Sequence, residues 1–165
     1  MIDFNEFTQR ADDCGVRLEI IGGLPVWEML PNLRHQKAID RIRQSFRVAY
    51  DQAEQPCECV HYPDLHVKFP DGSDKRPDIS IFCHEPGETD FAVTDVPEAV
   101  IEILSRGYEK KDLELGPPFY LGQGVKDVLV FDPHGLTVRH FNASGARQYP
   151  SPYTFILACG CQVTV

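Results

Sequence analysis

The sequence lacks any apolar run long enough to cross a membrane, which takes about 20 consecutive apolar residues. Its first residues, Met1-Ile2-Asp3-Phe4-Asn5-Glu6, also lack the basic start and apolar stretch of a secretory signal peptide. These absences argue against a membrane partner and against secretion. A cytoplasmic location is therefore expected.

Basic residues are scarce as well. The chain has 16 lysines and arginines against 25 aspartates and glutamates, which gives a formal net charge of −9. This balance argues against a protein that grips nucleic acid over its whole surface, because phosphate binding needs clustered Lys and Arg. Local basic strips remain compatible with a nucleic-acid site. The alternative is that each strip is a solvated helix face. The strips are Arg34, Lys37, Arg41 and Arg43 in one segment and Arg106, Lys110 and Lys111 in another.

Several catalytic signatures are missing from the sequence. It contains no Ser-His-Asp arrangement, no glycine-rich loop of the kind that cradles phosphate, and no dinucleotide-binding fingerprint. It also shows no internal repeat, low-complexity segment or linker. A hydrophobic content of 42% and a charged content of 25% are ordinary for a soluble globular protein. We therefore expect residues 1–165 to form a single domain with a substantial core.

Cysteine, in contrast, is present six times, at Cys14, Cys57, Cys59, Cys83, Cys159 and Cys161. In a cytoplasmic chain these residues are expected to be reduced thiols. The two Cys-x-Cys pairs raise the question of zinc, because four thiolates can complete a tetrahedral site. Structural zinc ligands, however, usually have at least two residues between them. Both sulfurs of a Cys-x-Cys pair in a strand point to one face, where they serve as small core residues, so zinc is the less favoured interpretation.

Hydrophobic spacing predicts a helix, a hairpin and a second helix in the first part of the chain. Residues 3–14 fit a short amphipathic helix. The apolar runs 16–21 and 24–30 flank two glycines, which is typical of a β-hairpin with a two-residue turn. A long helix is predicted over residues 34–53, opened by Asn32 or Pro31. Its apolar positions recur at steps of three and four and should face a sheet; they are Ile39, Ile42, Phe46, Ala49 and Ala53.

The rest of the chain is predicted to be mostly strands. The segment 108–123 is weakly helical but contains Pro117-Pro118, so its helix either starts near Gly116 or is kinked there. The predicted strands are residues 58–69, 77–83, 97–104, 125–131 and 136–141, with one or two short strands in 154–165. This order of elements predicts an α+β (mixed α/β) domain in which helices flank a mixed β-sheet.

Two carboxylates stand out because each lies in a strand-like apolar run. Asp78 lies in the run Arg76–Phe82, and Glu102 lies in the run Pro97–Leu104. Burial of a lone carboxylate costs its hydration, and two adjacent carboxylates repel unless a cation lies between them. Mg²⁺ and Mn²⁺ prefer such oxygen ligands. The pair therefore predicts a divalent-metal site, with both carboxylates on adjacent strands and on one side of the sheet. Alternatively, each lies at a strand end in water.

The stretch from Arg76 to Pro133 resembles the Uma2 family of proposed restriction endonucleases, within the PD-(D/E)xK nuclease superfamily. The resemblance covers roughly residues 16–141 and rests on an ordered set of motifs rather than on any single tripeptide. These motifs are Leu18-Glu19 before Gly22-Gly23, Pro31 with His35, Arg76-Pro77-Asp78, Glu98-Ala99-Val100-Ile101-Glu102-Ile103-Leu104-Ser105, Asp112 with Tyr120, Gly124-Val125 and Val130-Phe131-Asp132-Pro133.

The resemblance implies a restriction-endonuclease-like core with a helix, a mixed sheet of at least four strands and a second helix. It also implies that Asp78 and Glu102 are catalytic and bind Mg²⁺ or Mn²⁺. In nucleases of this superfamily the metal and a lysine activate water for attack on a phosphodiester. The implied function is a metal-dependent DNA endonuclease, with DNA as the partner.

The sequence departs from the family pattern at the lysine. Leu104 stands at the superfamily position, two residues after the acid, and Gly116 stands at the position that Uma2 members commonly use instead. The cation would then come from Arg106, Lys110 or Lys111. We predict Lys111 as the third catalytic residue, because it directly precedes Asp112 and has a flexible stem. The alternative is a catalytically inactive module that keeps the nuclease fold and binds DNA or protein.

Three further residues have two interpretations each. Glu19 is either a third acid of the site or an exposed hairpin residue. His35 either contacts phosphate or metal or is a polar residue near a helix start. Tyr120 either faces the site or belongs to the core.

A C₂ homodimer is expected, because cutting both strands of a duplex needs two active sites and C₂ dimers are the commonest soluble assembly.

Overall fold

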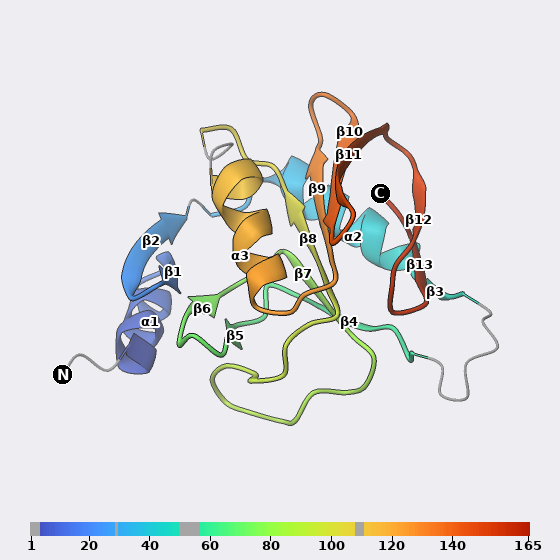
Figure 1. The fold of residues 1–165 in the computed structure, drawn as a ribbon. Helices are drawn as coiled ribbons and strands as arrows, with labels where there is room; N and C mark the ends of the chain where they lie inside the picture. Colours follow the sequence, from blue (N-terminus) through green and yellow to red (C-terminus); the bar gives the residue numbers. More distant parts are fainter. Residues whose placement is uncertain (1–3, 29, 50–56, 108–110) are drawn as a thin grey trace.

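The computed structural model describes residues 4–28, 30–49, 57–107 and 111–165 (Figure 1). The described elements are helices and strands arranged around a central sheet, with a smaller sheet on each side. The architecture is α+β, as predicted, and the central sheet is mixed. No helix within these residues is long and apolar enough to span a membrane.

The N-terminal part of the chain forms a small sheet covered by helix α1 (Phe4–Asp13). Its strands lie in the order β2-β1-β6-β5, namely β2 (Leu24–Glu28), β1 (Arg17–Ile21), β6 (Asp74–Lys75) and β5 (Val67–Lys68). The predicted hairpin β1–β2 is confirmed. Gly22 and Gly23 have φ of 57° and 80°, and a tight two-residue turn needs positive φ at both positions.

The central sheet has the strand order β11-β10-β9-β8-β7-β4. Strands β8 and β9 run parallel, and the other neighbours are antiparallel. The bounds are β4 (Val60–Pro63), β7 (Ile79–Phe82), β8 (Ala99–Ile103), β9 (Asp127–Asp132), β10 (Thr137–Asn142) and β11 (Gly145–Pro150). Strand β11 was not predicted. The predicted strand 58–69 is instead divided between β4 and β5, and Asp64, with φ of 55°, lies between them.

Two helices lie on opposite faces of the central sheet, with α3 (Gly116–Gly122) in front and α2 (Leu33–Gln44) behind in Figure 1. Helix α3 begins at Gly116, so its two prolines stand in the first turn, where proline is tolerated. A π-helical turn, η1 (Lys111–Leu115), precedes it. Both predicted flanking helices therefore exist, and the prediction of a start near Gly116 is confirmed.

Helix α2 is shorter than the predicted segment 34–53. Asn32 caps its start by accepting a hydrogen bond from the His35 backbone N–H at 3.1 Å. The helix ends at Gln44 because the Ser45 hydroxyl bonds the Ile42 carbonyl and the chain then extends into strand β3 (Arg47–Val48). Ile39, Ile42 and Phe46 are buried as predicted, whereas Ala49 is not helical and Ala53 lies outside the described residues.

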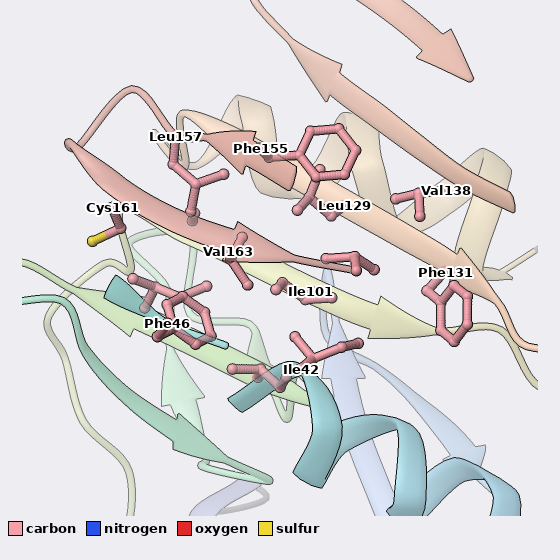
Figure 2. Packing of buried hydrophobic residues seen from close by; sticks show 14 of the residues in the cluster. Ile42, Phe46, Ile101, Leu129, Phe131, Val138, Phe155, Leu157, Cys161 and Val163 are labelled. Carbon is pink, nitrogen blue, oxygen red and sulfur yellow. The ribbon is translucent and has the colours of Figure 1, made fainter. Parts of the chain in front are cut away.

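The largest core cluster lies between α2, one face of the central sheet and a C-terminal hairpin. That hairpin consists of β12 (Thr154–Ile156) and β13 (Cys161–Thr164), and β13 also pairs with β3. Figure 2 shows Ile42 and Phe46 beside Ile101 of the sheet and Val163 of the hairpin. A second cluster fills the opposite face under α3 and includes Val100, Tyr120 and Val128. Side chains of β8 therefore alternate between two cores.

Four of the six cysteines are paired in disulfides, which corrects the expectation that all of them are reduced thiols. Disulfides join Cys57 to Cys83 and Cys59 to Cys161, and Cys159 lies close to the first of these. Cys14 is exposed and free. The sequence could not show this convergence, because it depends on packing the C-terminal hairpin against the start of β4 and the end of β7.

Candidate active site

Asp78 and Glu102 meet across the antiparallel pair β7–β8. Ile79 pairs with Ile101 in the register, so Asp78, just before β7, lies opposite Glu102. The Asp78 backbone N–H donates to Glu102 Oε2 at 3.1 Å, and both side chains line one small cavity. The two are 4% and 7% exposed, so neither carboxylate extends into bulk water. The predicted placement on adjacent strands and one side of the sheet is confirmed, while their catalytic and metal-binding roles stay predictions.

The Asp78 carboxylate is held by three donors from different parts of the fold. Oδ2 accepts the Ile103 backbone N–H at 2.7 Å, and Oδ1 lies 2.9 Å from His35 Nε2 and 3.4 Å from Arg17 Nη2. Together these contacts fix the orientation of the carboxylate. His35 is thus a buried partner of Asp78, placed there by the Asn32 cap at the start of α2.

Glu102 is in a less favourable electrostatic position. Burial and then the neighbouring Asp78 charge raise its pKa to about 8, although Lys75 acts in the opposite direction. The Tyr120 hydroxyl of α3 donates to Glu102 Oε1 at 2.5 Å. Burial and then the nearby Glu102 charge raise the Tyr120 pKa well above its ordinary value, so this hydroxyl keeps its proton. Without a cation, Glu102 therefore holds a proton near neutral pH.

Two buried lysines lie beside the acids, and one of them escaped the sequence analysis. Lys75 of β6 is fully buried, 3.2 Å from Glu19 Oε2, with its ammonium 4.8 Å from the ring centre of Tyr120. The 3.2 Å approach is an ion pair without hydrogen-bond geometry. Lys75 stands three residues before Asp78 in a polar turn-like stretch, so no apolar pattern marked it as interior.

Lys111 reaches the site, as predicted, but is not exposed. Its ammonium lies 3.2 Å from Glu19 Oε2, contacts Glu28 Oε1 and is 3.9 Å from Asp112 Oδ1. The side chain is only 12% exposed. Removing Lys111 would leave the Glu19 and Glu28 carboxylates with less compensation.

Glu19 is a buried acid of the site rather than an exposed hairpin residue. Burial by itself would raise its pKa, but Lys75 and then Lys111, together with the Arg76 backbone N–H at 2.9 Å, outweigh burial and lower the pKa to about 2. Asp112 shows the opposite balance, because burial outweighs Lys111 and raises its pKa to about 6. Glu19 is therefore firmly ionised, whereas Asp112 and Glu102 titrate near neutrality.

Asp78, Glu102, Lys111 and Asp112 line a cavity of about 30 Å³, and Glu19, Lys75 and Tyr120 lie outside its lining. Its lining is Arg17, Glu28, His35, Asp78, Glu102, Ile103, Ser105, Lys111 and Asp112. A water molecule needs at least about 10–15 Å³, so the cavity admits a small ion or one or two waters. Within the described residues, Asp78 and Glu102 belong to no group of three His, Cys, Asp or Glu ligand atoms that all lie within 4.8 Å of one another. A metal here would therefore take these two carboxylates as its protein ligands, as Mg²⁺ commonly does.

A larger cavity of about 370 Å³ adjoins the first and shares His35 and Ser105 with it. Arg34 Nη1 lies 2.6 Å from His134 Nδ1, and Arg106 Nη2 lies 3.5 Å from the same atom. All three side chains are exposed at the mouth. Two members of the predicted basic strips thus converge beside the acids. Arg106 belongs to this surface rather than to the acid cavity, and Lys110 lies outside the described residues.

The match to known proteins agrees with this geometry. A family model described as "Uma2: Putative restriction endonuclease" matches residues 4–155, which is most of the chain. The chain belongs to the Uma2 family. Its restriction-endonuclease-like fold is shared with a solved structure from Anabaena variabilis ATCC 29413, described as "a putative nuclease belonging to DUF820". That likeness has a TM-score of 0.63 at 20% identity and covers 82% of this chain and 78% of the other.

Uma2 membership supports a nuclease, and proteins of the restriction-endonuclease-like class generally use divalent metals. At 20% identity the solved structure shows the fold alone. No curated protein matches the chain. In this Uma2 chain, the site residues that the sequence predicted, Asp78, Glu102 and Lys111, lie around one cavity. Lys75, which it missed, lies behind them and pairs with Glu19.

Proposed function

We propose that this Uma2 protein is a DNA endonuclease that hydrolyses phosphodiester bonds with Mg²⁺ or Mn²⁺ held by Asp78 and Glu102. The observation that carries the proposal is the buried Asp78–Glu102 pair at a cavity that Lys111 also lines. Two buried carboxylates of one sign, one of them with a pKa near 8, form a site that a divalent cation would stabilise. When bound, such an ion supplies Lewis acidity to a phosphoryl oxygen and to water.

The chain's own residues have separate tasks in this proposal. His35 and the Ile103 backbone N–H fix the Asp78 carboxylate, and Tyr120 fixes that of Glu102. Lys111 provides positive charge beside the cavity, where it orients water and stabilises charge that develops on phosphate oxygens. Lys75, behind Glu19, keeps that acid ionised and holds the acidic wall in place. Leu104 and Gly116, at the usual lysine positions, provide no charge.

Phosphate binding is assigned to the larger neighbouring cavity. Arg34 and Arg106 converge on His134 at its mouth, next to the acids. A guanidinium binds phosphate in a bidentate manner, so a DNA strand passing over this surface would place a phosphodiester near Asp78. This local basic surface allows a chain with net charge −9 to bind DNA at one place.

The competing function is a catalytically inactive nuclease-fold module that binds DNA or protein. It rests on the loss of lysine at both usual positions, and on the fact that Lys111 is already paired with Glu19 and Glu28. In that case the ion pairs of Lys111 would be structural, and the Asp78–Glu102 pair would hold a proton rather than a metal. The two functions differ in one measurable result, which is metal-dependent cleavage by the wild-type chain.

Assembly and location complete the proposal. A homodimer would provide two active sites for a duplex and join two basic surfaces into one groove. We also propose that residues 1–165 act as a single domain in the cytoplasm. Light scattering checks the dimer, and a monomer mass at tens of micromolar would contradict it.

The deciding experiment incubates purified protein with plasmid DNA and Mn²⁺ or Mg²⁺, beside Asp78→Ala, Lys111→Ala and a chelator control. We expect cleavage by wild type, none by Asp78→Ala or Lys111→Ala, and none with the chelator. Lys126→Ala is the matched control, because Lys126 is an exposed lysine paired with Glu98 and neither residue lines the acid cavity. Equal cleavage by wild type and Asp78→Ala would mean contamination, and no cleavage by either would favour the inactive module.

A further inference from the structure

Five of the six cysteines form one sulfur cluster at the end of the central sheet away from the acids. Cys57 is the common member of two groups in which all sulfurs lie within 4.8 Å of one another. One group adds Cys83 and Cys159, and the other adds Cys59 and Cys161. A disulfide needs one partner for each sulfur, whereas Cys57 has four sulfur neighbours, including Cys161 at 3.5 Å. This convergence exceeds what two separate disulfides require.

We propose that the reduced chain binds one zinc ion through the thiolates of Cys57, Cys59, Cys83 and Cys161. Zinc prefers four thiolates in a tetrahedron at about 2.3 Å, which places the sulfurs about 3.8 Å apart. Cys57 Sγ lies within 4.8 Å of the other three sulfurs, so rotation of the side chains would bring the four thiolates around one ion. Cys57, Cys59 and Cys161 are buried, so water is excluded from most of the site. Cys159 is the spare thiol beside it.

The local backbone removes the objection raised by the Cys-x-Cys spacing. In a regular strand both sulfurs of such a pair would point to one face of the sheet. Cys57 and Cys59, however, precede β4, and Cys59 has φ of 55°, a left-handed conformation that is uncommon for a residue other than glycine. Cys159 lies in the turn before β13, next to Gly160, with φ of 85°. These turns direct neighbouring cysteines differently, so ligands from one pair need not share a face.

The two disulfides of the structure are the oxidised, zinc-free form of the same four sulfurs. Two molecules of hydrogen peroxide balance the conversion: four zinc-bound thiolates lose four electrons and become two disulfides. Four protons are taken up, four waters form and Zn²⁺ is released. In a reducing compartment the thiolate form dominates, so the cluster changes from a covalent to a metal cross-link without moving the chain far.

The site would act as a cross-link rather than in the nuclease chemistry. It joins the start of β4 and the end of β7 to the C-terminal hairpin. Most of that hairpin lies after residue 155, where the family match ends. Asp78 precedes β7 and Cys83 follows it, so the two sites lie about 17 Å apart at 3.3–3.4 Å per strand residue. Zinc here therefore does not depend on the proposed function.

The test measures zinc directly. Wild-type protein, reduced with a phosphine under argon, is equilibrated with zinc and analysed for bound metal after gel filtration, and a second sample receives Co²⁺. We expect one zinc per chain and the visible absorption of a tetrahedral cobalt thiolate. Cys57→Ser and Cys161→Ser should lose both, while Cys14→Ser and Cys159→Ser keep them. Asp78→Ala with Glu102→Ala should also keep them, which excludes zinc in the acid cavity.

Oxidation gives an independent check on the wild-type chain, which avoids any folding defect of a serine variant. Peroxide should release the zinc as measured with a colorimetric chelator, and circular dichroism should show that the fold persists. Absence of zinc from the reduced wild type, or a cobalt spectrum without thiolate character, would overturn the proposal. Loss of zinc in Cys159→Ser would overturn the choice of four ligands.

Discussion

Adjacent residues of β8 face two very different environments. Ile101 lies in the apolar core against α2, where its neighbours are hydrophobic residues of the helix, sheet and C-terminal hairpin (Figure 2). Glu102 points to the opposite face, beside Asp78 and Tyr120. The first face gains stability by excluding water. The second holds buried charges whose balance depends on cations. One strand thus carries the main stabilising face and the main candidate for function side by side.

Among variants that test the two faces of β8, Glu102→Gln should have the largest effect. Glu102→Gln keeps the side-chain shape but removes a ligand charge, so DNA cleavage should fall by at least about 10³-fold, equivalent to roughly 4 kcal/mol of transition-state stabilisation. Plasmid nicking assays with Mn²⁺ measure this. Mg²⁺ should also raise the melting temperature of wild type and not of the variant. Glu114→Gln, an exposed acid of η1, should behave like wild type.

Lys75→Met should have the next largest effect, on stability. It leaves Glu19 buried with one partner fewer, and breaking a buried pair costs about 3–5 kcal/mol. Urea unfolding measures the loss. The double variant Glu19→Gln, Lys75→Met should recover much of it, because no unpaired charge is then left inside. An unchanged midpoint for Lys75→Met would show that the pair does not stabilise the fold.

Ile101→Ala tests the opposite face of the same strand. Deleting a fully buried isoleucine should cost about 2–5 kcal/mol of unfolding free energy. Cleavage at a temperature where the variant remains folded should nevertheless stay near the wild-type rate, since Ile101 does not line the acid cavity. A large loss of activity in the folded variant would mean that the two faces are coupled through the strand.

The pH dependence of stability should sharpen the contrast further. The folded pKa of Glu102, about 8, lies above its ordinary value of 4.5, so the folded chain holds a proton that the unfolded chain has lost between these values. Metal-free stability should therefore fall as pH rises from about 5 to 8, with Asp112 contributing in the same direction up to about pH 6. The pKa of Glu19 is lowered to about 2, so this carboxylate changes the stability only below about pH 4.5. Urea unfolding at several pH values checks this, and saturating Mg²⁺ should flatten the slope.

The smallest effects are expected at the basic surface. Arg34→Ala and Arg106→Ala should each weaken DNA binding a few-fold and lower the salt slope of the binding constant by about one unit. Fluorescence anisotropy at several salt concentrations gives both values. Arg10→Ala, on the exposed face of α1, is the matched control. Unchanged salt slopes in Arg34→Ala and Arg106→Ala would place the DNA elsewhere.

The sequence predicted the carboxylate pair because local patterns defined it. Asp78 and Glu102 interrupt apolar runs, and the adjacent strands need only a loop to pair. It missed Lys75 because the burial of that residue depends on β6 pairing with β1, more than fifty residues earlier in the chain. It extended α2 too far because the apolar spacing continues through Phe46 to Ala49 and Ala53. The helix instead ends at Gln44, where the Ser45 hydroxyl bonds both the Ile42 carbonyl and the Thr164 backbone of β13.

The cysteines show the same limit in another form. Both Cys-x-Cys pairs were visible in the sequence, and their spacing favoured small core residues over zinc ligands. Their convergence depends on contacts across sequence separations of 26 and 102 residues, which no local pattern contains. Long-range packing of a C-terminal hairpin, rather than residue type, therefore decides whether such pairs form one site.

The acid cavity lies at a seam between two sheets, and this has a consequence for how the chain folds. Asp78 and Glu102 are 24 residues apart, whereas Arg17 reaches Asp78 across 61 residues from the N-terminal sheet. Closing the longer loop costs more chain entropy, so the carboxylate pair should form before its cationic partners arrive. During that interval the pair lacks its cationic partners, and a divalent cation can take their place. We therefore expect Mg²⁺ to accelerate refolding as well as to stabilise the folded state.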